Sequence, residues 1–112
     1  MRNPLIVTIQ TPEAQGEGAW IKFKRLSWGE RRQVRDDISE LKGIDLDEYI
    51  WSFVFERLVD FSWQDADGKA LAVPKSKDDI DDYTDEEIDC MLGAAGKAIR
   101  GELVFSDEEK KG

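Results

Sequence analysis

The chain has 112 residues, a length typical of one domain, and 40% of them are hydrophobic and 37% charged. Its formal net charge of −9 argues against a general nucleic-acid-binding protein, because such proteins gain affinity by neutralising phosphates with Lys and Arg. It contains no histidine, so it lacks the commonest general base near neutral pH and the commonest metal ligand.

Cysteine content and hydropathy indicate the compartment. The single cysteine, Cys90, has no partner for an intramolecular disulfide, as expected in a reducing cytoplasm. The apolar run near the N-terminus is too short for the hydrophobic region of a signal peptide. No run approaches the roughly 20 apolar residues that a helix needs to cross a bilayer. We therefore expect a cytoplasmic protein with no membrane partner.

Charge is unevenly distributed along the sequence. Residues 1–42 carry eight Lys and Arg and six Asp and Glu, a balance of +2, whereas residues 43–112 carry eight and nineteen, a balance of −11. Such polarity can steer a partner, or favour self-association in which the basic end of one copy meets the acidic face of the next. The simpler interpretation is that both regions are solvated surface, because exposed charges usually contribute little.

Two strands that pair as a hairpin are the first elements expected. β-branched and apolar residues predict the first strand over Leu5–Gln10, and a loop with one Pro and two Gly follows over residues 11–18. Over Ala19–Leu26, apolar side chains alternate with lysines. This alternation predicts a strand with one face exposed to water.

A capping box predicts the first main helix. The hydroxyl of Ser27 can accept from the backbone N–H of Glu30, whose carboxylate can accept from the N–H of Ser27. We expect this helix to run to about Lys42, with Gly43 as its C-terminal stop. Trp28 is expected to pack over the corner between the second strand and this helix.

The second main helix is expected from Asp45, as its N-cap, to Asp60. Its apolar residues cover two adjacent faces, made by Tyr49, Ile50, Phe53, Val54 and Leu58 and by Trp51, Phe55 and Val59. A helix that is apolar over most of its circumference is buried on several sides. It is therefore either the central helix of the core or a core helix that also supplies an oligomer interface.

A short central hairpin and a third helix complete the expected fold. The segment Phe61–Pro74 is expected to form this hairpin, or an extended excursion, around the turn Asp65–Gly68. A further capping box, Thr84–Glu87, begins a helix that ends near Gly101 and buries Ile88, Met91, Leu92, Ala95 and Ile99. The fold class is α+β, predominantly helical, with three main helices packed with an N-terminal β-hairpin and a short central hairpin. We expect one globular domain over residues 1–104 and a disordered charged tail over 105–112.

No set of residues favours catalysis or metal binding. The turn Asp65–Gly68 lacks the glycine and glutamate positions of an EF-hand loop, so a tight turn is favoured. The acidic run 78–87 lies in a polar connection and a first helical turn, where carboxylates suit the helix dipole. Cys90 has no basic neighbour in sequence that would make it reactive. We expect no enzyme activity, no cofactor and no metal site.

The segment 19–35, AWIKFKRLSWGERRQVR, combines aromatic and basic side chains. Such a combination can bind single-stranded nucleic acid by stacking. The alternation and the capping box instead favour a strand–helix corner with exposed charges, then a surface for a protein partner, with nucleic acid least favoured. The residues that we single out for binding a protein partner are Lys22, Lys24, Arg31, Arg32, Arg35, Trp51 and Phe55.

The order of motifs over residues 19–95 resembles the tail assembly chaperones of long-tailed bacteriophages. The strongest part of the resemblance is a tryptophan in a strand, an Asp-Gly turn, a proline and a T-x-E-E helix start, at Trp63, Asp67, Gly68, Pro74, Thr84, Glu86 and Glu87. The resemblance implies a non-catalytic protein of the host cytoplasm that is absent from the finished virion and binds tail tube and tape-measure proteins. It also implies two forms made by a programmed ribosomal frameshift, for which Lys110–Lys111 would be encoded by an adenine run.

Two other classes of function stay open. One is a small head–tail connector or completion protein that remains in the phage particle. The other is an acidic mimic that inhibits a nucleic-acid enzyme of the host, which the net charge of −9 would suit.

Overall fold

A computed structural model describes residues 5–103, which form an α+β fold. Three strands form an antiparallel sheet in the order β1-β2-β3, with bounds β1 Ile6–Gln10, β2 Trp20–Lys24 and β3 Leu58–Phe61. The helices are α1 Pro12–Gln15, α2 Trp28–Glu40, α3 Gly43–Arg57, the 3-10 helix η1 Lys77–Ile80 and α4 Asp85–Arg100. The expected charged tail at 105–112 lies outside the described residues.

The helix-rich α+β class and the N-terminal hairpin are confirmed. β1 pairs with β2 in a register that sets Val7 opposite Phe23 and Ile9 opposite Ile21. The connection between the strands contains the one-turn helix α1, which has Pro12 at its first position, where proline's missing N–H costs nothing.

The predicted helix to Asp60 is wrong at its C-terminal end. α3 ends at Arg57, and the next four residues form β3, which pairs with β2. The register shifts between Lys22 and Phe23, which marks a bulge. Accordingly Leu58 and Phe61 are both buried while the two residues between them are exposed. A buried spacing of three is typical of a helix, and this spacing made the strand look helical in the sequence.

The boundary between the first two main helices is also corrected. α2 ends at Glu40, and Gly43 begins α3 instead of stopping α2. Gly43 has a φ of +58°, a conformation that glycine adopts without the cost of a side chain. The N-cap of α3 is Lys42 rather than Asp45, which lies in the first helical turn, where its charge suits the dipole.

Both capping boxes are confirmed, and they fix the starts of α2 and α4. In α2, Ser27 N–H donates to Glu30 over 3.0 Å and Glu30 N–H donates to the Ser27 hydroxyl over 3.3 Å. Thr84 and Glu87 make the same reciprocal pair in α4. α4 ends as expected at Gly101, whose φ of +74° is left-handed.

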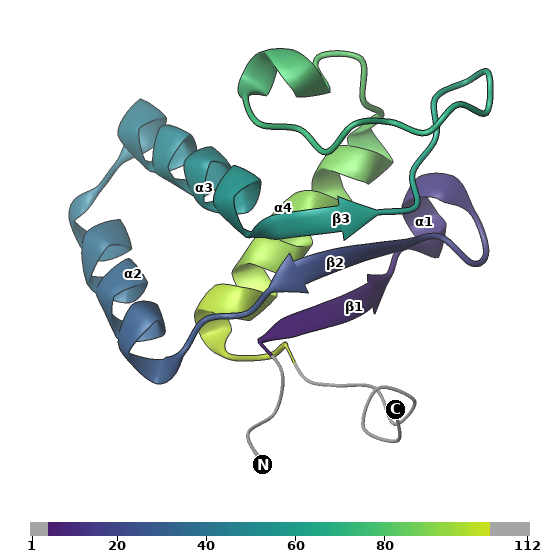
Figure 1. The fold of residues 1–112 in the computed structure, drawn as a ribbon. Coiled ribbons are helices and arrows are strands. Elements are labelled where there is room, and N and C mark those ends of the chain that lie inside the picture. The colour runs from purple at the N-terminus through teal and green to yellow at the C-terminus, as the bar shows by residue number, and fades with distance from the viewer. Residues whose placement is uncertain (1–4, 104–112) are drawn as a thin grey trace, which may run out of the picture.

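The core lies between one face of the sheet and the helices α3 and α4. Ile21 and Phe23 of β2 are fully buried there, together with Val54 of α3 and Met91 of α4. Figure 1 shows α4 crossing behind the sheet, with α2 and α3 together at one side of it. The buried side of α4 includes the alanines at 94, 95 and 98, whose small side chains let this helix pack close to the rest of the core.

The expected central hairpin is reduced to one isolated bridge, between Gln64 and Ala70. Trp63 anchors this segment, because it is 1% exposed and its Nε1 donates to the Thr11 hydroxyl over 3.0 Å. Its ring also stacks on Phe61 at 5.1 Å between centroids. The segment is thus held by side-chain packing rather than by a strand ladder.

The fold has two layers, which leaves one face of the sheet open. The extents are 41 × 39 × 19 Å, and the thin dimension accommodates one layer of sheet and one layer of helices. Within residues 5–103, no helix lies over the other face of the sheet (Figure 1).

Candidate protein-interaction surfaces

The uncovered side of the sheet, which we call the open sheet face, carries two of the predicted partner-binding residues. Its side chains come from all three strands: Ile6, Thr8, Trp20, Lys22, Lys24, Val59 and Asp60. The register sets Lys24 opposite Ile6 and Lys22 opposite Asp60. The Nζ atom of Lys22 also lies 5.3 Å from the ring centroid of Trp20, within cation–π range. This face therefore places basic groups beside exposed apolar ones.

Two of the three arginines of α2 contact the C-terminus of α4. Arg35 Nε donates to the carbonyl of Ile99 over 3.2 Å. The guanidinium of Arg31 lies so close to Gly101 that a Cβ added there would collide with it. Cations are favourable at a helix C-terminus because the last carbonyls carry partial negative charge. Arg31 and Arg35 thus have a role inside the fold.

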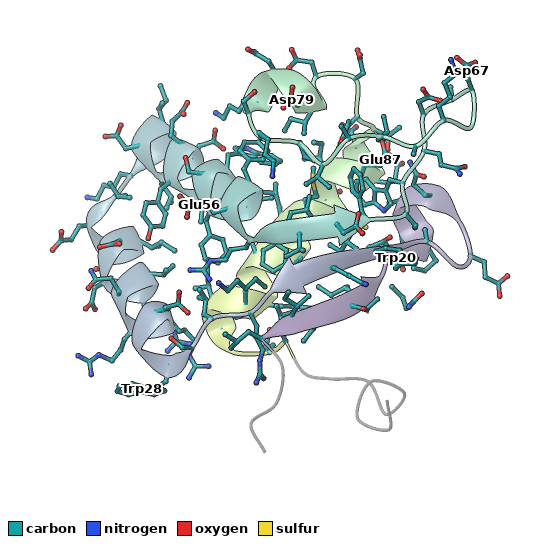
Figure 2. All side chains as sticks on the ribbon, in the orientation of Figure 1. Trp20, Trp28, Glu56, Asp67, Asp79 and Glu87 are labelled. Atoms are coloured by element: carbon teal, nitrogen blue, oxygen red, sulfur yellow. The ribbon has the colours of Figure 1, made fainter. Side chains whose placement is uncertain are left out.

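Trp28 does not pack over the strand–helix corner, and that prediction is wrong. Its side chain is 64% exposed, and Arg32 lies over its ring at 4.9 Å from the centroid. The reason is helical periodicity, since Trp28 lies about 120° around α2 from the buried Val34. Figure 2 shows Trp28 pointing away from the body of the molecule. Trp28 and Arg32 form an exposed pair of residue types that are enriched at interaction hot spots.

Trp51 and Phe55, the predicted binding residues of α3, stack at 5.6 Å between centroids. Trp51 is buried and Phe55 half-buried. A cavity of about 360 Å³ separates this part of α3 from the segment 75–78. Across it, Lys77 Nζ donates to Asp47 over 2.8 Å and to Glu48 over 3.1 Å, which raises the pKa of Lys77. This second apolar face of α3 is therefore partly covered by the chain itself.

A groove between α2 and α3, which we call the α2–α3 groove, was not predicted. It has a volume of about 270 Å³ and an apolar floor that includes Val34 and Phe53. Arg57 donates to Glu30 over 2.8 Å, and this hydrogen bond is the main cause that lowers the pKa of Glu30 to about 2. In the sequence, the spacing of residues 30, 34 and 37 indicates only that they share one side of α2. The groove forms because α3 packs beside that side.

At the other end of the groove, the hydroxyl of Tyr49 donates to Asp37 over 2.9 Å. Burial, with this bond as a second cause, raises the pKa of Tyr49 to about 12, so the hydroxyl remains a donor at neutral pH. The groove is thus bounded by one side-chain bridge near each end.

The acidic residues gather around the N-terminus of α4. A cavity of about 790 Å³ is lined by Asp65, Asp67, Asp79, Asp82 and Glu87, among others, and Figure 2 labels three of these carboxylates. Glu87 is buried and accepts from Gln15 Nε2 over 2.6 Å. The described residues contain no group of three or more such side chains that could hold a metal ion.

The acidic turn at residues 65–68, which lines part of this cavity, is tight, as predicted. The Asp65 carboxylate accepts from the N–H groups of Asp67 and Lys69 over 2.9 and 3.0 Å. Gly68 supplies a φ of +82° in the turn.

Cys90 is half-buried, and burial is the first cause that raises its pKa, which disfavours the reactive thiolate.

The predicted partner-binding residues do not form one site. Lys22 and Lys24 lie on the open sheet face, Arg32 lies on the outer side of α2, and Trp51 and Phe55 lie against the segment 75–78.

No helix within residues 5–103 is both long enough and apolar enough to cross a membrane. Comparisons of the chain with protein-family models, curated proteins and solved structures find no significant match.

Proposed function

We propose that this chain is a non-catalytic assembly chaperone of long-tailed phages that acts in the host cytoplasm and binds tail tube and tape-measure proteins. The motifs over residues 19–95 suggest the family. The observation that carries protein binding is the open sheet face, where Ile6 and Val59 are each 45% exposed beside two lysines.

This surface has the chemistry that a transient chaperone needs. A client offers apolar surface before it is assembled, and exposed apolar side chains such as Ile6 and Val59 can cover it. Lys22 and Lys24 lie on the central strand β2 and place two positive charges on this face. Their like charges oppose stacking of this face on copies of itself, which favours a reversible complex over aggregation.

Co-expression tests this role. The tail tube protein encoded with this chain is produced alone, with the native chain, and with a chain carrying Ile6→Lys and Val59→Lys. We expect the native chain to raise the soluble fraction of the tube protein and the double variant to raise it less. Glu17→Lys, an exposed change in the loop after α1, is the matched control. Equal solubility with and without the native chain would contradict the proposal.

Mass spectrometry of purified virions separates a chaperone from a head–tail connector. A chaperone is absent from the finished particle, whereas a connector is present in fixed copy number.

In the gene, a slippery heptamer in the codons for residues 108–112, with an overlapping downstream frame, is the expected sign of a second, longer form.

The acidic end of the molecule favours one second candidate, an inhibitor that mimics nucleic acid. Apart from the buried Glu87, the carboxylates of the segment 65–89 are exposed around η1 and the start of α4. Such a mimic would bind a basic host enzyme with strong salt dependence and would capture no tail protein.

A further inference from the structure

The α2–α3 groove is built from two helix faces that meet at matching intervals. On α2 its lining includes Glu30, Val34 and Asp37, which recur at i, i+4 and i+7. On α3 it includes Tyr49, Phe53 and Glu56, with the same spacing. Residues at these intervals share one side of a helix, so each helix presents a continuous stripe to the groove.

Two side-chain bridges hold the walls of the groove in place. Glu30 is bonded to Arg57 and Asp37 to Tyr49. Because seven residues separate Glu30 and Asp37, the bridges are about 10 Å apart along α2. The apolar floor at Val34 and Phe53 lies between them in the chain order of both helices. The groove therefore has the length of about two helical turns.

The size of the groove suits side chains of a partner protein. Its volume of about 270 Å³ is below the roughly 300 to 1,000 Å³ of small-molecule pockets. It is enough for one or two apolar side chains of a partner. Helices commonly dock in this way, by placing residues at i, i+3, i+4 and i+7 into an apolar groove.

The charge of the groove favours cationic residues beside the apolar side chains of the partner. Its lining holds three carboxylates, those of Glu30, Asp37 and Glu56, and the single guanidinium of Arg57. Glu56 is exposed. An anionic rim around an apolar floor is complementary to a segment that has apolar residues on one side and cations next to them.

We propose that the α2–α3 groove binds a helical segment of a partner protein, with apolar residues at i, i+3, i+4 and i+7 flanked by Lys or Arg. The partner lays its apolar stripe over Val34 and over Phe53, whose ring centroid lies 5.8 Å from the guanidinium carbon of Arg57. Its cations approach the carboxylates of Glu56 and Asp37. This inference deepens the proposed function, and rests on it for identifying the partner as a tail protein.

The test uses the full chain, labelled with nitrogen-15, and a synthetic helical peptide as the probe. The peptide carries Leu at i, i+3, i+4 and i+7 and Lys at the flanking positions. A second peptide has the same composition in shuffled order. We expect saturable amide shifts centred on Val34, Ser52 and Glu56 with the first peptide, and binding by the shuffled peptide weaker by about tenfold or more.

Charge variants locate the binding. Glu56→Lys should weaken binding of the first peptide by about tenfold, because it places a cation at the anionic rim. Asp36→Lys makes the same charge change at an exposed position of α2 outside the groove, and should change the affinity by less than about twofold. Circular dichroism verifies that both variants are folded, and Glu56→Gln provides a milder change at the same position.

Several results would overturn the inference. They are the absence of binding, equal binding of the shuffled peptide, shifts centred on residues 78–89, or equal loss in the two lysine variants. Self-association of the chain through this groove, detected as a dimer by sedimentation, would overturn it as well.

Capture of tail proteins is measured separately, so the two proposals fail independently. Intact peptide binding without tail-protein capture contradicts the proposed function alone. Intact capture without peptide binding contradicts the groove alone.

Discussion

Replacing Thr11 with valine should destabilise the fold through Trp63. Thr11 is 2% exposed and Trp63 1% exposed, and the indole N–H donates to the threonine hydroxyl over 3.0 Å. Valine keeps the shape of threonine but removes the acceptor, so a buried N–H loses its partner. The expected loss is about 1 to 3 kcal/mol in the free energy of unfolding, or roughly 5 to 15 °C in Tm for a domain of this size.

Urea unfolding followed by circular dichroism measures this loss. Thr11→Ser is the matched control, because it keeps the hydroxyl and should lose less than the valine variant. In a Trp63→Phe background the N–H is absent, so the further cost of Thr11→Val should fall. A cost of Thr11→Val that is the same in both backgrounds would refute the assignment of the loss to this hydrogen bond.

Three further changes test other parts of the structure by urea unfolding. Gly101→Ala should lower the free energy of unfolding by about 1 to 2 kcal/mol, because its φ of +74° is left-handed and the new Cβ displaces the Arg31 guanidinium; no loss would contradict the assigned cap. Arg35→Glu should cost about 1 kcal/mol by placing an anion at the C-terminus of α4, whereas Arg32→Glu should cost little. The pKa of Glu30 falls from 4.5 to about 2 beside Arg57, so stability from this pair is complete above pH 4.5 and is lost as the pH falls toward 2. Since Glu30 is 41% exposed, this effect should be at most about 1 kcal/mol, and it should disappear in Glu30→Gln.

Local signals in the sequence predicted the elements that local chemistry controls. The capping boxes at Ser27 and Thr84 were predictable because their bonds join residues three apart. The same holds for Gly101, whose left-handed cap completes its own helix. These features need no knowledge of the rest of the fold.

The errors occur where a distant part of the chain decides the structure. Leu58 and Phe61 have helical spacing, but pairing with β2 converts them to a bulged strand. Trp28 was expected to pack over the strand–helix corner, although the side of α2 that carries it faces solvent.

The candidate surfaces follow the same division. The exposure of Lys22 and Lys24 could be predicted from alternation within one strand. The α2–α3 groove could not, because it depends on how two helices are placed relative to each other. Likewise, nothing near Arg35 in the sequence shows that it reaches the carbonyl of Ile99.

Capture of tail proteins by the folded chain tests the proposed function most directly. The affinity-tagged chain is co-expressed with untagged tail tube and tape-measure proteins encoded with it, and the complexes are recovered at physiological salt. A chaperone retains at least one of the two in a defined ratio, and Ile6→Lys with Val59→Lys weakens that retention while Glu17→Lys does not. Recovery of neither protein, with a chain that circular dichroism shows to be folded, would contradict the proposed function.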